Sequence, residues 1–192
     1  PTMPFLFRSV DHMRKTLDGP VGDEILKSCE SAGFIGLAFY DSGARCFYNA
    51  RRPLLVPADL AGMKIRVPPS DIFIATAQAF GANPTPLSYG ETFSALQTHL
   101  IDGAENNWPS FHGSRHFEVA RYWSQTLHSC SPDVLLMSQR RWDAMADDDR
   151  QLLRRIARES VQVARTLWDE RESQSRAAAV AATARPAGPD PI

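Results

Sequence analysis

Apolar residues recur at helical spacing early in the chain and then give way to short extended runs. A helix is predicted from about Asp23 to Gly33, which supplies its C-terminal stop. Ile35 to Tyr40 reads as an apolar, aromatic strand, and Asp41-Ser42-Gly43 predicts a turn before a second extended stretch. A helix that leads into a strand through a glycine is typical of α/β proteins, which is the fold class that we expect.

A further strand is predicted at Met63 to Val67, where apolar side chains alternate with basic ones. Arg66 is therefore expected to point away from the packed face, and Pro68-Pro69 ends the strand directly after it. α/β folds place ligand crevices at strand ends, and a guanidinium can meet a carboxylate with two parallel hydrogen bonds. From the pattern alone, a surface arginine or a structural salt bridge is the favoured interpretation. Arg45, which lies among aromatic residues beside the predicted turn, admits the same interpretations.

Two helices and a polar loop follow this strand. Ser70-Asp71 can begin the first helix, and Ser88 and Glu91 form the S-x-x-E capping box of the second. The GANPTPLS segment between them is expected to be loop. Asn106-Asn107-Trp108-Pro109 combines amides that can bind hydroxyls with an aromatic surface that suits sugars. A plain turn explains this last segment equally well.

The last third of the chain predicts a long helix. Asp147-Asp148-Asp149 places acids at a helix N-terminus, where the helix dipole favours them, and an apolar stripe continues through Trp168. Beyond Ser175 the composition reduces mainly to Ala, Pro and Arg. We expect a disordered tail there.

The composition is that of a globular protein with a small partner. The 192 residues carry 21 basic and 22 acidic side chains, so no basic face indicates nucleic acid. No apolar run approaches the roughly 20 residues of a membrane span, and the first residues lack the pattern of a secretory signal. Cys29, Cys46 and Cys130 show no metal spacing and are expected to be small buried residues; one disulfide is the alternative.

An enzyme has little support in the sequence. His112 and His116 have the i,i+4 spacing of a metal site, which suggests a metal-assisted hydrolase, but the glutamate of H-E-x-x-H is absent. Asp102 and Glu105 could form an acid–base pair, although acids beside a turn are usually structural or solvated. The nucleophile elbow, the P-loop and the dinucleotide motif are missing. We expect neither catalysis nor a cofactor, and keep the hydrolase and a non-catalytic interaction module as alternatives.

Four segments, in this order and at these separations, resemble one protein family. They are YDSGAR, PADLAGMKIRVPPSD, FGANPTPLSYGETFSALQT and IDGAENNWPS. Together they resemble the solute-binding subunits of tripartite ATP-independent periplasmic (TRAP) transporters, the DctP-type family, from about Pro4 to Ser175. The resemblance implies a monomeric periplasmic protein that captures an organic acid and delivers it to a sodium-driven membrane permease. The residues of YDSGAR and AENNWPS are more similar to the branch of the family that takes sugar acids, such as uronates and aldonates.

The resemblance also implies a ligand site without a metal. In the family, the arginine of the K-I-R-V strand makes a bidentate contact with the substrate carboxylate, which corresponds to Arg66. The arginine of S-G-A-R and the first asparagine of A-E-N-N assist it, which correspond to Arg45 and Asn106. Three further residues complete the expected ligand-binding set: Asn107, Ser70 and Tyr89.

The fold that the resemblance implies is a type II-like periplasmic-binding-protein fold of two lobes with a long lobe-spanning C-terminal helix. By analogy, residues 1–42 and 131–171 belong to lobe I and residues 43–130 form most of lobe II. Residues 172–192 are expected to hold the end of the long helix and the disordered tail. The sequence lacks the family's signal peptide and first βα units, so lobe I is expected to be incomplete at the N-terminus.

Overall fold

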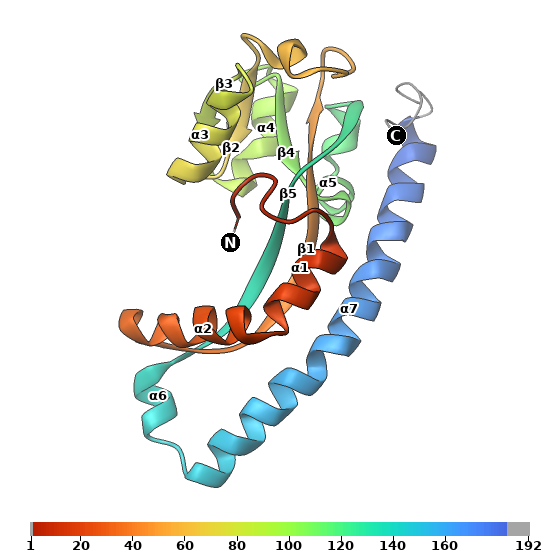
Figure 1. The fold of residues 1–192 in the computed structure, drawn as a ribbon. Helices are drawn as coiled ribbons and strands as arrows, with labels where there is room; N and C mark the ends of the chain where they lie inside the picture. The colour runs from red at the N-terminus through yellow and green to blue at the C-terminus, as the bar shows by residue number, and fades with distance from the viewer. Residues whose placement is uncertain (1, 184–192) are drawn as a thin grey trace. The chain divides into compact units, whose positions relative to one another are not determined.

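The computed structural model describes residues 2–183, which have the expected mixed α/β architecture (Figure 1). The helices are α1 (Val10–Leu17), α2 (Pro20–Ser28), α3 (Asp71–Ala79), α4 (Thr92–Gln97), α5 (Trp108–Gly113), α6 (Gln139–Asp143) and α7 (Asp147–Thr183). The strands are β1 (Phe34–Asn49), β2 (Lys64–Val67), β3 (Asn83–Pro86), β4 (Gly103–Asn106) and β5 (Tyr122–Ser138). Short 3-10 turns lie at Cys29–Ala32, Pro57–Leu60, Tyr89–Glu91 and His116–Glu118. Within residues 2–183, no helix has the length and apolar character needed to cross a membrane.

The described chain divides into two compact units. Unit 1 comprises Phe5–Gly43 and Cys130–Glu170. Unit 2 comprises Thr2–Pro4, Ala44–Ser129 and the described chain from Arg171. The elements β1, β5 and α7 therefore each contribute residues to both units.

Unit 2 is built on a mixed sheet. The strand order is β3-β2-β4-β1-β5. β2 runs parallel to β3 and to β4, with Arg66 opposite Ala104. β1 runs antiparallel to β4, with Cys46 opposite Asn106. This register makes the strands that carry Arg45, Arg66 and Asn106 close neighbours.

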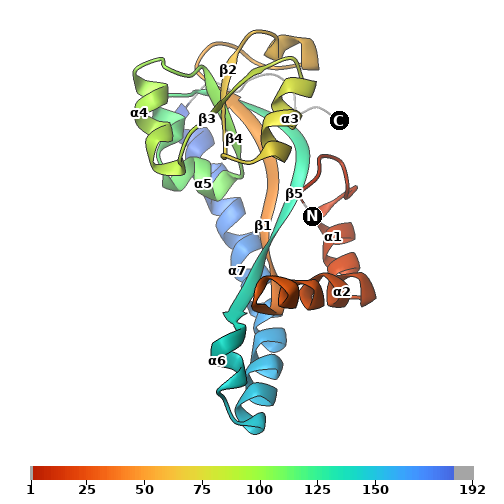
Figure 2. The same cartoon turned by 90° about the vertical axis from the view of Figure 1, so that its left-hand side faces the viewer.

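Helices cover both faces of the sheet in unit 2. On one face, α3 packs on the β2 side chains of Ile65 and Val67. On the other, α4 and α5 pack with Ala104 of β4, and Figure 2 shows α3 on the opposite side of β2 and β4 from these two helices. Since Arg66 alternates with Ile65 and Val67, it lies on the α4 and α5 side. The sequence predicts a polar face there, but Arg66 is only 4% exposed.

Unit 1 combines the N-terminal part of β1 and the C-terminal part of β5 with α1, α2, α6 and most of α7. Its apolar core is formed by Ile35, Leu37 and Ala38 of β1, which pack with Trp142 of α6 and Ala157 of α7. This unit contains the apolar strand that the sequence predicts at Ile35 to Tyr40. The long C-terminal helix is also as predicted, with its three acids in the first turn.

The predicted turn at residues 41–43 is wrong, because β1 continues unbroken from Phe34 to Asn49. Gly43 has a φ of +67°, a conformation that glycine adopts without strain. A side chain at this position would also meet the Trp168 ring at 3.1 Å. Glycine therefore lets the strand pass this point without reversing direction.

The prediction of loop for GANPTPLS is also wrong, because Asn83–Pro86 forms the edge strand β3. The N–H groups of Asn83 and Leu87 donate to the carbonyls of Met63 and Val67, at 2.8 and 3.2 Å. Pro84 and Pro86 occupy the alternate positions, where an N–H would face away from the sheet. Two prolines are tolerated here because β3 needs no donor on its outer side.

The predicted tail is helical for longer than the sequence suggests. α7 extends to Thr183, so residues 176–183 are helical rather than disordered, because alanine has the highest helix propensity. The rest of the predicted tail, residues 184–192, lies outside the described residues.

Two further local predictions can be compared with the structure. The capping box of Ser88 and Glu91 is confirmed. Cys46 and Cys130 are buried, as expected from the sequence, while Cys29 is partly exposed.

A substitution at Gly103 tests the close packing of β4 against β1. A methyl group here would overlap the carbonyl oxygen of Tyr48 and lie 2.7 Å from the Cβ of Asn49. We expect Gly103→Ala to lower the free energy of unfolding by about 2 kcal/mol or more, because backbone atoms cannot rotate away. Gly113→Ala is the matched control, since nothing beyond its own helix backbone lies within 4 Å of the added Cβ. Equal denaturation midpoints for the two variants would contradict this packing.

Candidate functional site

The predicted ligand residues are all in unit 2, on neighbouring strands and at the starts of the helices that follow them. Arg45 lies on β1, Arg66 on β2 and Asn106 on β4. Ser70 comes directly before α3, and Asn107 directly before α5. Because β2 and β4 are parallel, the segments that follow them emerge at the same edge of the sheet, where α/β proteins bind ligands.

Arg66 is a buried guanidinium without a counter-ion among residues 2–183. Its Nε donates to the carbonyl of Leu87 at 3.0 Å, and its guanidinium carbon lies 5.8 Å from the centre of the Tyr89 ring. No carboxylate among residues 2–183 lies within 4 Å of the Arg66 guanidinium. Its two terminal nitrogens have no hydrogen-bond partner among these residues, and both keep some exposure to solvent. Burial lowers the pKa of Arg66, and the charge of Arg45 acts in the same direction. An arginine keeps its proton even so, so Arg66 presents an unbalanced positive charge.

Arg45 is held in a different way, by a buried ion pair with Glu105. Its Nε and Nη2 donate to the two carboxylate oxygens of Glu105 at 2.5 and 2.8 Å, and Nη2 also donates to the Glu105 carbonyl at 3.1 Å. Burial alone would raise the pKa of Glu105, but the charge and hydrogen bonds of Arg45, together with the contact to His128, outweigh burial and the net shift is downward. Arg45 is therefore neutralised by the protein itself, which agrees with the salt-bridge interpretation of this residue, although the sequence does not indicate Glu105 as the partner. Only its Nη1 is left without a partner in the described chain.

His128 supports Glu105 from the other side. Its Nε2 lies 3.6 Å from the carboxylate of Glu105, and its Nδ1 is 2.9 Å from the hydroxyl of Thr126. A carboxylate facing Nε2 favours the tautomer with its proton on Nε2, so Thr126 donates to Nδ1. The ring is also stacked on Phe47 at 4.4 Å between centres. These contacts fix the position of Glu105, and through it the position of Arg45.

The two asparagines that follow β4 have different surroundings. The Oδ1 of Asn106 accepts from the N–H of Asn107 at 2.9 Å, and its amide nitrogen has no partner within the described residues. The Oδ1 of Asn107 accepts from the N–H of Ser110 at 2.8 Å and caps α5. The predicted loop is therefore short, because Trp108 already begins a helix.

Ser70 and Tyr89 border the same region. Ser70 occupies the N-cap position of α3, but its side chain makes no capping hydrogen bond. The Tyr89 hydroxyl is already engaged: it donates to the carbonyl of Ser110 at 3.1 Å and lies 2.5 Å from the hydroxyl of Ser114. Tyr89 therefore offers the face of its ring beside Arg66 rather than its hydroxyl.

Tyr48 and His116 are part of this interior, and the sequence does not predict their pairing. The Tyr48 hydroxyl lies 2.7 Å from Nδ1 of His116, and both side chains are buried. Burial, together with the charge of Arg66, lowers the pKa of His116 to about 4. His116 is therefore neutral at pH 7. The sequence pattern around Tyr48 predicts an extended segment, but it cannot indicate that His116, 68 positions away, is the partner.

The metal hypothesis for His112 and His116 loses its structural premise. α5 ends at Gly113, between the two histidines, and Arg115 then adopts a left-handed conformation with a φ of +58°. The i,i+4 spacing therefore does not place the two rings on one helical face. Among residues 2–183, no cluster of three His, Cys, Asp or Glu side chains could hold a metal ion.

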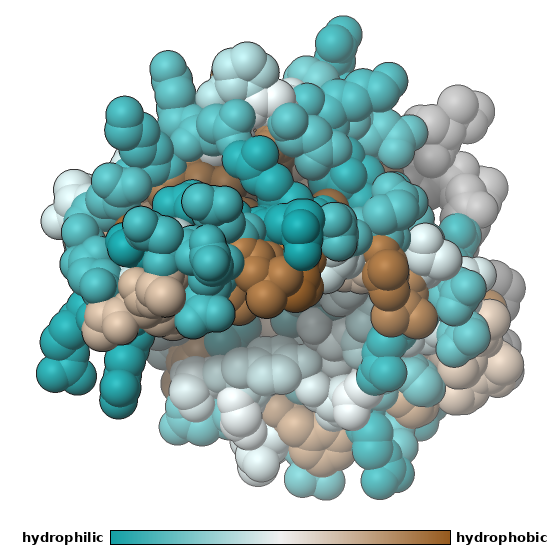
Figure 3. All heavy atoms as spheres, turned by 90° about the horizontal axis from the view of Figure 1, so that it is seen from below, coloured by the Kyte–Doolittle hydropathy of each residue, from teal (hydrophilic) through white to brown (hydrophobic). Residues whose placement is uncertain are grey.

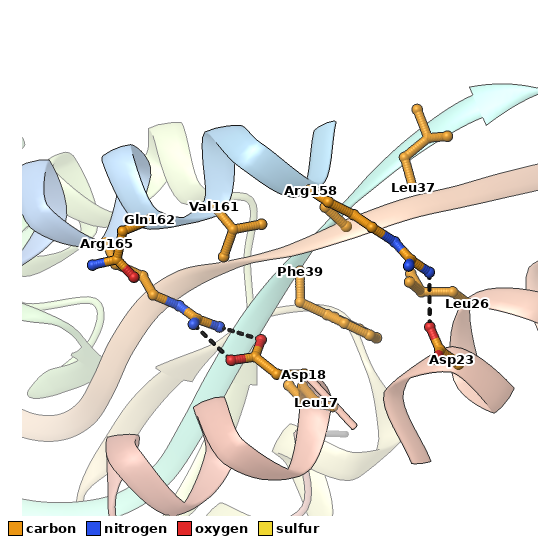
Figure 4. Close-up of a pocket in the computed structure, with 11 residues that line it drawn as sticks. Leu17, Asp18, Asp23, Leu26, Leu37, Phe39, Arg158, Val161, Gln162 and Arg165 are labelled. Atoms are coloured by element: carbon orange, nitrogen blue, oxygen red, sulfur yellow. Dashed lines mark hydrogen bonds and ion pairs between the residues drawn. The ribbon is translucent and has the colours of Figure 1, made fainter. Parts of the chain in front are cut away.

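A separate pocket of about 280 Å³ lies within unit 1, between α1, α2, β1 and α7 (Figure 4). Its arginines are already paired: Arg165 makes two bonds to Asp18 at 2.7 and 2.8 Å, and Arg158 contacts Asp23 at 3.1 Å. None of the predicted ligand residues lines this pocket. The Arg66 region of unit 2 is therefore the stronger candidate for binding an anion.

Glu105→Gln tests the buried ion pair. The substitution keeps the shape of the side chain but leaves the buried Arg45 charge without a partner. We expect unfolding free energy to fall by about 3–5 kcal/mol. Glu118→Gln is the control, because its exposed pair with Arg115 contributes no more than about 1 kcal/mol. Similar losses of unfolding free energy for both variants, measured by urea denaturation, would show that the buried pair contributes no more to stability than the exposed one.

His116 should produce a pH dependence of stability. Between pH 6.5 and 4 the unfolded chain binds a proton at His116 that the folded chain excludes, so stability falls as the pH decreases. The full loss is on the order of 3 kcal/mol. Since His116→Gln cannot gain this proton, its stability should fall less over the same range. An NMR titration of the imidazole with a midpoint near 6.5 would disprove the shift.

Comparison with known proteins identifies the family. Residues 1–185 match the DctP family, described as bacterial extracellular solute-binding protein, family 7. A TRAP periplasmic solute-binding protein of Bradyrhizobium sp. BTAi1, solved with α/β-D-galacturonate, is 54% identical to this chain with a TM-score of 0.91. The match covers 94% of this chain and 60% of that one. A second, from Chromohalobacter salexigens with bound D-glucuronate, is 37% identical with a TM-score of 0.92 and the same coverage.

A curated relative shows the breadth of the family. The C4-dicarboxylate-binding periplasmic protein DctP of Vibrio cholerae is 36% identical over 157 residues, which are 82% of this chain and 47% of that protein. The chain spans about half the length of the curated relatives it matches. The resemblance and the fold class predicted from the sequence are thereby confirmed. This chain belongs to the DctP family of bacterial extracellular solute-binding proteins.

Proposed function

We propose that this chain binds a sugar acid of the uronate class and holds its carboxylate at Arg66. The observation that carries the proposal is the contrast between two buried arginines: Arg45 is neutralised by Glu105, while Arg66 has no carboxylate partner in the described chain. Leaving a charge buried and unpaired is costly. A ligand carboxylate would supply the missing charge and accept two parallel hydrogen bonds from the guanidinium.

Polar groups around Arg66 suit the hydroxyls of a sugar ring. The amide nitrogen of Asn106, the hydroxyl of Ser70 and Nη1 of Arg45 are donors without partners in residues 2–183. The exposed ring of Tyr89 adds a flat apolar surface of the kind that sugars stack on. We keep Asn107 in the proposed set as well, although one of its side-chain bonds caps α5.

The charge balance favours a monocarboxylate over a C4-dicarboxylate. A dicarboxylate carries two negative charges, and its second carboxylate would need another unbalanced cation. Arg45 is the nearest choice, but Glu105 already occupies two of its donor nitrogens. A uronate has a single carboxylate, and the solved neighbours with galacturonate and glucuronate support this class.

The cellular role is proposed from the family. Its members are extracellular solute-binding proteins, and binding rather than catalysis is the activity that their names describe. We propose that this chain acts in the periplasm as a monomer and passes its ligand to a sodium-driven TRAP permease. The assignment of residues 1–42 and 131–171 to lobe I, and of 43–130 to lobe II, is part of the same proposal.

Arg66 substitutions test the carboxylate contact. A charge-assisted hydrogen bond is worth about 1.5–3 kcal/mol, so Arg66→Ala should weaken binding of D-galacturonate at least about tenfold. Arg66→Lys should also lose affinity, because an ammonium cannot reproduce the two-pronged contact. Arg121→Ala, which removes an exposed arginine from the same unit, serves as the control. Isothermal titration calorimetry measures all four proteins.

The outcome separates three possibilities. Unchanged galacturonate affinity in both Arg66 variants would reject Arg66 as the carboxylate contact. Tighter binding of succinate than of galacturonate by the unsubstituted chain would reject the uronate class while leaving an acid site in place. Equal losses in the Arg66 and Arg121 variants would indicate non-specific charge attraction.

A further inference from the structure

Tyr48 on β1 and Arg66 on β2 flank Ala104 of β4, the strand between them. Both residues are opposite Ala104 in the register of the sheet, so the three side chains lie on the same face. Neighbouring strands are about 4.8 Å apart, which separates the Cα atoms of Tyr48 and Arg66 by about 10 Å. The small side chain of Ala104 leaves the space above it to the two longer ones.

His116 contacts Tyr48 directly and is connected to Arg66 through Tyr89. Its Nδ1 lies 2.7 Å from the Tyr48 hydroxyl. The His116 ring meets the Tyr89 ring in a T-shaped contact at 5.8 Å between centres, and the Arg66 guanidinium carbon lies 5.8 Å from the centre of the same Tyr89 ring. These four side chains form one contiguous group, which we call the Arg66–His116 cluster.

The two basic members of the cluster are buried. His116 is 1% exposed and Arg66 is 4% exposed, whereas polar residues cover most of the molecular face shown in Figure 3. The rings of Phe111 and Trp123 lie 4.7 and 5.9 Å from that of Tyr48, between centres. Water screens charges weakly in such surroundings. A change of charge at Arg66 therefore acts on His116 more strongly than it would at the surface.

The positive charge of Arg66 disfavours a proton on His116. Burial is the larger cause of the low pKa of His116, which is about 4, and the charge of Arg66 is the second cause. A carboxylate bound to Arg66 would offset the second cause and leave burial in place. The pKa of His116 would then rise but would stay below its ordinary value.

Tyr48 allows His116 to change its charge without moving. Burial raises the pKa of Tyr48, so its hydroxyl keeps its proton at neutral pH. A hydroxyl can donate to a bare ring nitrogen or accept from a protonated one. Tyr48 can therefore stay bonded to Nδ1 of His116 in both charge states of the ring.

Other ionisable groups on the elements around His116 do not balance the charge of Arg66. The neighbouring helix α4 contains none. The others are the Arg115–Glu118 pair and Glu91 at the surface, Glu105, which pairs with Arg45 on the opposite face of β4, and His112, whose ring stacks on Phe117. Among these groups, Arg66 is the one whose charge is both buried and unbalanced within residues 2–183.

We propose that His116 is the proton acceptor of the acid site at Arg66. It is neutral while the site is empty, and it takes up a proton when a carboxylate fills the site. The inference rests on the proposed function, because it requires an acid at Arg66. It adds that the site captures the acid together with a proton, through a residue outside the proposed ligand-binding set.

This coupling makes binding depend on pH in one direction. The filled site holds the additional proton more tightly than the empty site, so lower pH favours the filled site. A tenfold gain in the proton affinity of His116, from a starting pKa of about 4, would raise ligand affinity about twofold between pH 7 and pH 5. It would also take up about 0.4 proton per ligand at pH 5. The ligand carboxylate stays ionised over this range, since carboxyl groups of this kind titrate below about pH 4.

Two Arg66 variants test the coupling without a ligand. Arg66→Gln removes the charge and should raise the proton affinity of His116 at least about threefold. Arg66→Lys keeps a positive charge and should change the proton affinity less. NMR titration of the imidazole signals measures both effects, with His116 assigned from the spectrum of His116→Gln. Exposed His99, which lies outside the cluster, is the internal control.

Calorimetry with D-galacturonate tests the proton uptake itself. Titrations at pH 5 in two buffers of different ionisation enthalpy give the number of protons taken up per ligand. The unsubstituted chain and the control His112→Gln should both show uptake. His116→Gln should bind galacturonate without uptake, and its affinity should not change between pH 7 and pH 5. A purely structural role of His116 would instead alter affinity equally at both pH values and leave the uptake in place.

The outcomes separate this inference from the proposed function. If the unsubstituted chain does not bind galacturonate, the proposed function is rejected and this inference with it. Binding without proton uptake, or with uptake that persists in His116→Gln, would overturn the inference and leave the carboxylate contact at Arg66 intact. An unchanged titration of His116 in Arg66→Gln would also overturn it.

Discussion

The buried ion pair between Arg45 and Glu105 sets the charge balance on which the site in unit 2 depends. Two guanidinium groups in one interior would repel each other, and the charge of Arg45 already acts to lower the pKa of Arg66. Glu105 offsets one of the two charges, and His128, held by Thr126, fixes Glu105 in place. As a result, Arg45 is a neutralised and rigidly held hydrogen-bond donor, while Arg66 keeps a positive charge that is available to a ligand.

Local sequence signals predict those parts of the fold that are determined locally. The capping box of Ser88 and Glu91 and the acids at the start of α7 depend on neighbouring residues, so their spacing is sufficient. The continuity of β1 and the edge position of β3 depend on contacts with distant elements. Gly43 reads as a turn residue because glycine is common in turns, and only the Trp168 ring beside it explains its place in a strand.

The site follows the same division. Arg66 could be placed at a strand end from the pattern of its neighbours, and the family resemblance gave it a role. The pairing of Arg45 with Glu105 could not be predicted, because these residues are 60 positions apart and meet only through the register of β1 and β4. For the same reason the spacing of His116 suggests His112 as its partner, whereas in the fold its partner is Tyr48 on β1.

The outer edge of β3 limits how this sheet can assemble. Open-ended stacking of sheets into a fibre requires a competent edge on each side, so that every added copy exposes a new one. Pro84 and Pro86 remove the outward N–H groups of β3 and close that side. With β3 closed, copies of the sheet cannot add on both of its sides, and the two prolines act as a barrier against fibre growth through this sheet.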